Sequence, residues 1–434
     1  MPRLVRLLWL IVLSWVAAGP AAAQEMRGHG GPVRALAVTA DGRTAISGSF
    51  DSSAILWSIE TGAAIQVLRF HDGAVNAVAA LPDGRFVTAG EDGRIALWQA
   101  GRPEPVRVIE GHAGPIAALA VSPDGLRIAS ASWDGTARVA SIATGEAEVV
   151  AGHKGPLNAV AFMPDGRSLV TGGHDQTLRI TPLGGGGARS VDIGVSVNAL
   201  VVAADGEIAA AGADGRVHRV SSGGVTQGEI VASETPLVAL ALSPDGRRLA
   251  AAGIRGSVAL IERQAGYPGG RVERLLVGPG LPVWSVAFRP GGQELLTGGG
   301  DRLVRRWDAA SGEHIGPVAM SRPEDPLARY NGDRGAEVFR ACVACHTLDA
   351  DGANRAGPSL HGVIGRRIGS APGYSYSPAF RTLDIVWSKD TIARLFEIGP
   401  TAYTPGTKMP EQTIADPDDR AALVDFIARV TARP

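Results

Sequence analysis

The sequence predicts a multi-domain protein whose larger part is an all-β domain, a ring of seven repeated units. A chain of 434 residues is too long to fold around one hydrophobic core. A short apolar strand that runs into a tight turn occurs seven times, and six of these turns carry an aspartate at intervals of 40 to 42 residues. The 58 glycines and the 5% aromatic content are typical of a domain rich in turns. A period of this length predicts four-stranded units that close into a seven-bladed β-propeller.

Each repeat begins with the apolar strand and its first turn, as in VRALAVTADG at residues 33–42. A strand of small residues and a second turn follow, and alternating apolar strands between such turns predict antiparallel pairing. The aspartates of the first turn are Asp41, Asp83, Asp124, Asp165, Asp205 and Asp245. The second turn carries, in chain order, Asp51, Asp92, Asp134, Asp175, Asp214, Arg255 and Asp301.

Within the repeats, a histidine, a hydroxyl residue, the aspartate of the second turn and a tryptophan recur at fixed positions. The set is His29, Ser47, Asp51 and Trp57 in repeat 1, and His71, Thr88, Asp92 and Trp98 in repeat 2. It resembles the buried hydrogen-bonded set of WD-repeat propellers. The resemblance implies that these histidines, and those of repeats 3 and 4, which lack only the tryptophan, are structural. We therefore interpret none of them as a catalytic base or a metal ligand.

The repeats also define the domain boundaries. The propeller is expected at residues 24–320, followed by a linker at 321–328 that contains two prolines and mixed charge. Either the strand at residues 313–319 or the segment at 24–28 can supply the outer strand of the last blade, and the sequence decides for neither. Residues 329–434 form a second, smaller domain.

Residues 1–23 have the features of a cleavable signal peptide. Arg3 and Arg6 precede an apolar run at residues 7–18, and three alanines precede Gln24. The run is shorter than the ~20 residues that a membrane-spanning helix needs, so cleavage before Gln24 is favoured over a retained anchor. The mature protein is therefore expected in the periplasm, without a membrane span.

The only two cysteines of the chain stand in Cys342-Val343-Ala344-Cys345-His346. Two thiols at this spacing can each add to a vinyl group of haem, and the histidine that follows can bind the iron. A zinc site would need a second pair of ligands, which the sequence lacks. A thioredoxin-like dithiol would stand at the start of a βαβ unit, which this region does not resemble. The segment therefore predicts one covalently attached c-type haem.

The last hundred residues or so resemble class I cytochromes c, which are small all-α domains. The similarity includes GAEVFRACVACH at residues 335–346, GPSLHGVIGRRIG at 357–369, PGTKMP at 405–410 and a closing helix at 420–430. The resemblance implies that His346 and Met409 are the two axial ligands of the haem iron. It also implies that the Pro358 carbonyl orients the His346 ring. Tyr376 and Trp387 would bond a haem propionate, with Arg366 close by.

Met409 also has an interpretation as ordinary core packing, because methionine fills gaps well. It stands in an extended loop flanked by prolines and not on an apolar helical stripe, which favours a ligand. His361 is the rival donor in this domain, and we expect it to be a surface or loop histidine.

A haem iron with both axial positions filled exchanges single electrons but does not bind a substrate at the metal. We therefore expect a periplasmic electron-transfer protein that meets a periplasmic redox partner through the propeller or the exposed haem edge. Two alternatives stay open. One is a haem-dependent oxidoreductase with its active site or second cofactor on the propeller, and the other is a haem-based redox or gas sensor. The formal net charge of −1 argues against nucleic acid as a partner, because phosphate binding needs a concentrated basic face.

Overall fold

A computed structural model of the chain describes residues 26–432 with internal gaps. The gaps are 264–269, 279, 317–326, 341, 344–345, 350–356, 373, 375, 377–379, 381, 406, 408 and 410–412. The expected signal peptide, Cys345 and most of the expected linker therefore lie outside the described residues.

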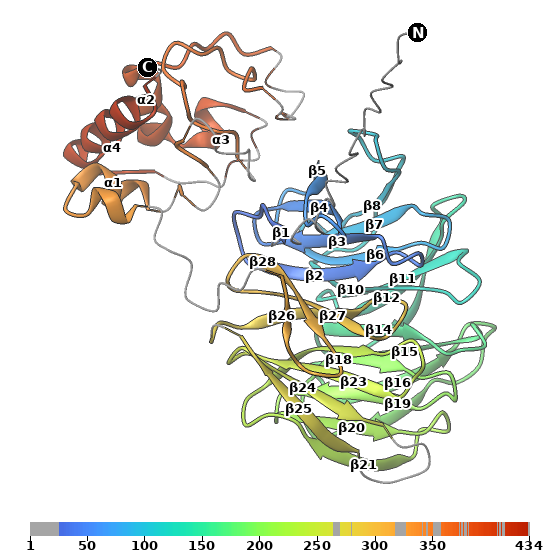
Figure 1. Cartoon of the computed structure of the whole chain (residues 1–434). Coiled ribbons are helices and arrows are strands. Elements are labelled where there is room, and N and C mark those ends of the chain that lie inside the picture. The colour runs from blue at the N-terminus through green and yellow to red at the C-terminus, as the bar shows by residue number, and fades with distance from the viewer. Residues whose placement is uncertain are drawn as a thin grey trace, which may run out of the picture.

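Seven antiparallel sheets form the larger domain, which confirms the predicted propeller (Figure 1). Blade 1 consists of β2 (Val33–Val38), β3 (Thr44–Ser49), β4 (Ser53–Ser58) and β5 (Ala64–Arg69). Blade 2 consists of β6 (Val75–Ala80), β7 (Phe86–Gly90), β8 (Ile95–Trp98) and β9 (Arg107–Ile109). Blade 3 consists of β10 (Ile116–Val121), β11 (Arg127–Ser132), β12 (Thr136–Ser141) and β13 (Ala147–Gly152).

The next three blades repeat this order of strands. Blade 4 consists of β14 (Leu157–Phe162), β15 (Ser168–Gly173), β16 (Thr177–Pro182) and β17 (Arg189–Asp192). Blade 5 consists of β18 (Val197–Val202), β19 (Ile208–Gly212), β20 (Arg216–Val220) and β21 (Thr226–Val231). Blade 6 consists of β22 (Leu237–Leu242), β23 (Arg248–Gly253), β24 (Ser257–Glu262) and β25 (Arg271–Val277).

Both ends of the propeller sequence contribute to the closure of the ring. Blade 7 contains β26 (Val283–Phe288), β27 (Glu294–Gly299) and β28 (Leu303–Asp308), and β26 contacts β2 of blade 1. The outer edge of β28 pairs with β1 (Met26–Arg27) at Leu303 and Val304 and with β29 (His314–Ile315) at Arg306 and Trp307. The two closures that the sequence left open are thus used together, each over two residues.

The first turn of each repeat is held by its own aspartate. The Asp41 carboxylate accepts the backbone N–H of Arg43 at 3.0 Å, and the intervening Gly42 has a φ of 68°, which glycine adopts without strain. The same bond recurs in blades 2 to 6 at Asp83, Asp124, Asp165, Asp205 and Asp245. The Asp-Gly pairs of the sequence therefore set the turn that joins the two innermost strands of a blade.

Buried hydrogen bonds tie each of the first blades together at the opposite end. In blade 1, Nδ1 of His29 lies 3.0 Å from Asp51 and Nε2 lies 2.7 Å from Ser47 Oγ, which also accepts the indole N–H of Trp57 at 2.7 Å. In blade 2 the same contacts join His71, Asp92, Thr88 and Trp98. Because burial would leave these groups without water, each needs the others as partners. Blades 3 and 4 keep the histidine, hydroxyl and aspartate bonds.

The smaller domain is helical, as predicted, and its elements follow the propeller in the chain. They are the 3₁₀ turn η1 (Ala328–Tyr330) and the helices α1 (Arg334–Phe339), α2 (Lys389–Ile398), α3 (Pro400–Tyr403) and α4 (Pro417–Val430). Asp333 and Asp416 cap the first turns of α1 and α4 by accepting backbone N–H groups, and Ser388 with Thr391 forms a capping box at α2.

The helices α1 and α4 pack directly against each other, and Gly335 allows their close approach. A Cβ at Gly335 would lie 2.2 Å from the carbonyl oxygen of Ala422 and 2.5 Å from Cβ of Phe426. Phe339 and Phe426 are fully buried beside this crossing, with ring centroids 5.7 Å apart. The helix pair forms one wall of the domain and leaves room on its other side for the site described below.

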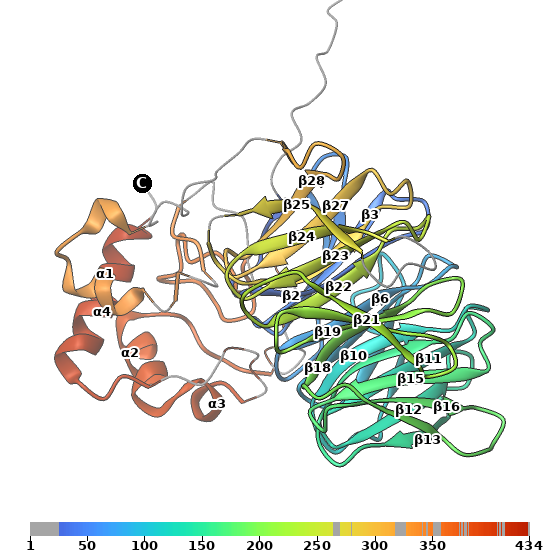
Figure 2. The ribbon, with the colours of Figure 1, turned by 90° about the horizontal axis from the view of Figure 1, so that it is seen from below.

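The helical domain lies to one side of the propeller (Figures 1 and 2). Direct contact is made by Arg69 at the end of β5, whose guanidinium carbon lies 4.2 Å from the ring centroid of Tyr374. Among the described residues, no helix has both the length and the apolar character needed to cross a membrane.

Candidate functional site

A cavity occupies the helical domain between α2, α4 and the loops around Pro358 and Met409. It encloses about 1170 Å³ including the solvent at its open mouth. Its lining is mainly apolar and includes Phe339, Leu360, Val363, Ile368, Ile392, Leu395, Phe396 and Ile427. An apolar cavity lowers the stability of a small domain unless a ligand fills it, because the side chains of its walls lose their packing partners.

His346 lies in the wall of this cavity with a fixed ring orientation. Its Nδ1 is 2.7 Å from the carbonyl oxygen of Pro358, so Nδ1 carries the proton and donates it to that oxygen. A neutral imidazole with its proton on Nδ1 has its lone pair on Nε2, which is the arrangement of a metal-ligating histidine. The Pro358 carbonyl therefore orients the His346 ring.

Gly357 explains why the loop can approach the ring so closely. A Cβ at this position would lie 2.4 Å from Cε1 and 2.7 Å from both nitrogens of His346. No real side chain tolerates such contacts, so a glycine is required for the imidazole to lie flat against the backbone. The role of Gly357 was not predicted from the sequence, although its place directly before Pro358 was a usable signal.

Met409 lines the same cavity as His346, whereas His361 is not among the described residues that line it. The backbone N–H of Met409 donates to Thr407 Oγ1 at 3.1 Å, and the N–H of Thr407 donates to the Thr404 carbonyl at 3.0 Å. These bonds hold the loop that carries the thioether. An imidazole and a thioether facing one apolar cavity form a donor set that suits haem iron.

Tyr376, Trp387 and Arg366 also line the cavity. The Tyr376 hydroxyl accepts the backbone N–H of Ala371 at 3.2 Å and keeps its own proton for donation, because burial raises the pKa of this phenol. The Arg366 guanidinium donates to the carbonyls of Ser359 at 2.7 Å and His361 at 3.1 Å. Arg366 thus braces the loop that holds His346, in addition to placing positive charge at the cavity.

Cys342 follows α1 and lines the cavity with only 6% of its surface exposed. Its backbone N–H donates to the Phe339 carbonyl at 2.8 Å, and the His346 N–H donates to the Cys342 carbonyl at 3.0 Å. The first bond joins Cys342 to the end of α1, and the second joins His346 to Cys342, so both residues lie at the same cavity. Cys345 lies outside the described residues.

The propeller contributes two charged residues to the cavity wall, Asp51 and Arg69. Asp51 belongs to the second turn of blade 1, and Arg69 pairs with Ser53 at the same end of that blade. Burial raises the pKa of Asp51, but the charge and hydrogen bond of His29 and the hydroxyl of Ser53 outweigh burial and lower it to about 2. Neither contribution was predicted from the sequence, because neither residue belongs to the helical domain.

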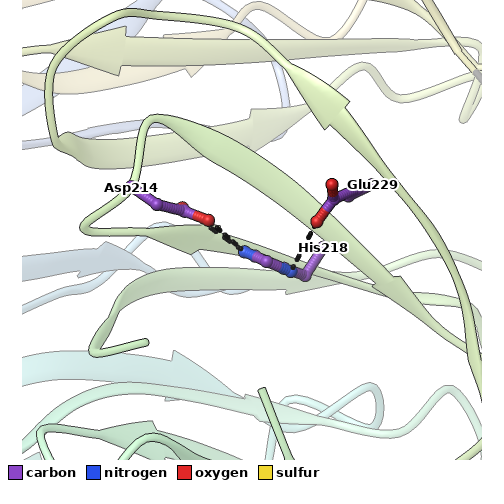
Figure 3. Close-up of side chains that lie close together, drawn as sticks. All are labelled: Asp214, His218 and Glu229. Atoms are coloured by element: carbon purple, nitrogen blue, oxygen red, sulfur yellow. Dashed lines mark hydrogen bonds and ion pairs between the residues drawn. The ribbon is translucent and has the colours of Figure 1, made fainter. Parts of the chain in front are cut away.

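A second group of potential metal ligands lies in blade 5, where Asp214, His218 and Glu229 converge (Figure 3). Nε2 of His218 is 3.1 Å from Asp214, and Nδ1 is 3.9 Å from Glu229. The Arg216 guanidinium forms an ion pair with Glu229 and lies 3.8 Å from Asp214, so the two carboxylates already share one positive charge. We interpret the group as structural, because His218 on β20 bonds the turn aspartate that a loop histidine bonds in blades 1 to 4.

Comparison with known proteins agrees with the division into two domains. Five segments match the family described as WD domain, G-beta repeat, and they correspond to blades 1 to 4 and 7. They are residues 22–58, 62–99, 103–140, 146–181 and 270–308. Residues 332–431 match the family described as cytochrome c.

Individual relatives are similar to the C-terminal domain over nearly their whole length. Cytochrome c type-1 of Ascaris suum is 39% identical over 115 residues, which are 26% of this chain and 97% of that protein. Cytochrome c of Cochliobolus lunatus is 42% identical over 99 residues, 23% of this chain and 91% of that protein. Cytochrome c of Arabidopsis thaliana is 42% identical over 99 residues, 23% of this chain and 88% of that protein.

Proposed function

Because this chain belongs to the cytochrome c family through its C-terminal domain, we propose that it is an electron-transfer protein with one haem attached through Cys342 and Cys345. The bound haem would supply reversible one-electron chemistry at its iron. His346 would bind the iron through Nε2 and Met409 through its sulfur. The observation that carries the proposal is the convergence of these two donors on one apolar cavity that Cys342 also lines.

The chain's own residues prepare the site for electron transfer in three ways. The Pro358 carbonyl holds His346 in the ligating tautomer, and Gly357 lets the ring pack without strain. The apolar side chains around the cavity exclude water, which stabilises the less charged ferrous state. Tyr376 would offer an O–H donor, and Arg366 a positive charge, to the carboxylates of a bound haem. A site with both axial positions filled and rigid walls changes little when the electron arrives.

The propeller would dock a redox partner close to this site. Phe50, Trp133 and Ile254 are exposed by 43%, 49% and 36%, and each directly precedes the second-turn residue of its blade. They therefore lie on the end of the ring that carries Asp51 and Arg69, beside the cavity. Exposed aromatic side chains on one face are typical of protein-binding surfaces. We assign this face to a periplasmic redox protein, reached after export through the signal at residues 1–23.

Replacement of the methionine sulfur tests the axial ligation. Met409→Leu keeps the side-chain volume but removes the thioether, so the ferrous variant should bind carbon monoxide, while the wild-type protein should not. Met163→Leu in blade 4 is the matched control and should behave like the wild type. A Met409→Leu variant that stays closed to carbon monoxide would contradict Met409 as the ligand and point to His361.

A further inference from the structure

The cavity of the helical domain has a wall that belongs to the propeller. Arg69 stacks on Tyr374, and the rings of Tyr374 and Tyr376 are 4.7 Å apart between their centroids. Arg69 is thus joined through one aromatic ring to the side of the cavity where Tyr376 carries its hydroxyl. Arg69 and Arg366 are the two arginines among the described residues that line the cavity.

Burial on the propeller side shows the same contact independently. The side chain of Asp51 is 1% exposed, whereas the equivalent aspartates of blades 2, 3 and 4 are 8%, 12% and 9% exposed. Their local hydrogen bonds are alike, and Asp51 is the one of the four that lines the cavity. The additional burial is therefore consistent with coverage of blade 1 by the helical domain.

The repeat itself does not call for an arginine at position 69. The residue two positions before the loop histidine is Arg27, Arg69, Glu110 or Ala151 in the four repeats that have this histidine. The corresponding position therefore tolerates positive, negative and apolar side chains. The fold of the blade therefore does not explain the arginine at position 69. Its contact with Tyr374 at the cavity does.

We propose that Arg69 makes the propeller a part of the haem site, as a positioning residue whose charge raises the reduction potential of the iron. This inference rests on the proposed function. Haem carries two carboxylates, so a second cation that lines the cavity beside Arg366 suits this ligand. A nearby positive charge also disfavours the ferric state, which carries one more unit of charge than the ferrous state.

Asp51 keeps the same negative charge when position 69 is changed. Its carboxylate is ionised and is held by His29 at 3.0 Å and by the Ser53 hydroxyl at 2.6 Å within blade 1. The backbone N–H groups of Gly30 and Ser53 also donate to it. Its contribution to the potential is therefore constant, whereas the guanidinium of Arg69, stacked on Tyr374, is the charge that the substitution removes.

The test is the midpoint potential of the full-length haem protein with Arg69→Gln, Arg69→Lys and Arg43→Gln. Arg43 is an exposed arginine of the same blade, at the far end of β3 and about 20 Å away by strand length. Arg69→Gln should lower the potential by about 30 to 60 mV, a threefold to tenfold change in the reduction equilibrium of a one-electron couple. Arg69→Lys should restore most of it, and Arg43→Gln should leave it unchanged.

An Arg69→Gln protein with full haem content and the potential of the Arg43→Gln control would overturn the inference while leaving the proposed function intact. Equal losses in Arg69→Gln and Arg69→Lys would also overturn it, because they would indicate a shape effect and not a charge effect. A wild-type protein without covalent haem would instead refute the proposed function, and the two failures are thereby distinguishable.

Discussion

Blade 2 of the propeller is filled by its own side chains, whereas the helical domain surrounds a cavity. In blade 2, Trp98 is 1% exposed and its indole N–H donates to Thr88, which also bonds His71. In the helical domain, His346 and Met409 face about 1170 Å³ of space, including the mouth. In the first region, the hydrogen-bonded side chains from His71 to Trp98 find their partners within a single repeat. In the helical domain, His346 and Met409 come from segments far apart in the sequence and line one cavity, which a ligand can fill.

This difference teaches where each domain gets its stability. A blade is stabilised by hydrogen bonds among its own residues and by packing on two neighbours, so it is complete without a cofactor. The helical domain has a small apolar core around Phe339, Leu423 and Phe426, and a domain of this size has little stability to spare. We infer that haem completes the core of the second domain, as a metal completes that of many small metalloproteins.

The largest expected effect separates the two domains directly. Cys342→Ala combined with Cys345→Ala should abolish covalent haem and with it the cooperative unfolding of the helical domain, because the empty cavity leaves its walls without packing. The thermal transition of the propeller should persist. Calorimetry of the full chain measures both transitions, and Val343→Ala, which keeps both thiols, is the control. A helical domain that melts normally without haem would break the comparison.

The next-largest effect compares two histidines of the propeller that bond a second-turn aspartate, His71 in blade 2 and His218 in blade 5. His71→Ala leaves Asp92 and Thr88 buried without their partner and should cost about 3 kcal/mol of unfolding free energy. His218→Ala should cost about 1 kcal/mol, because Asp214 is 25% exposed and keeps Arg216. Urea unfolding followed by tryptophan fluorescence measures both. Equal losses of unfolding free energy in the two variants would contradict the smaller effect expected at His218.

The ring and most of its blades could be predicted from the sequence because their determinants are local. Asp41 bonds the N–H two residues later, and the residues of the His29 set lie within one repeat. His218 and Arg305, which bond Asp214 and Asp301 in place of a loop histidine, were not predicted. Both side chains come from the third strand of the blade, four residues after the aspartate that they bond, and this spacing was a usable signal that the pattern of loop histidines does not include.

The functional site, too, could be predicted from the sequence only where its determinants are local. The motif around Cys342 and the Pro-flanked Met409 carry their chemistry in the sequence, and the cavity contains both. Asp51 and Arg69 stand more than 270 residues before Met409 in the chain and reach the cavity only through the arrangement of the two domains. No periodicity or motif encodes that arrangement. The pairing of β28 with both β1 and β29 could likewise not be predicted, because these strands come from opposite ends of the propeller sequence.

A smaller effect concerns acid stability. The pKa of Asp51 is about 2 in the folded protein, below its ordinary value of 3.8, so ionisation of this group stabilises the fold above about pH 4. That contribution, about 2 kcal/mol, disappears as the pH falls from 4 to 2. Asp51→Asn should therefore flatten the acid limb of the propeller's unfolding curve. An unchanged acid limb in the variant would mean that other carboxylates set it.

The most direct test of the central claim is the haem content of the purified full-length protein, expressed with a functional haem-attachment system. Pyridine haemochrome analysis should give one c-type haem per chain that denaturation does not release, and the oxidised protein should show the weak red absorption of methionine bound to ferric iron. A colourless protein, or one whose haem is extracted by acid solvent, would contradict the account.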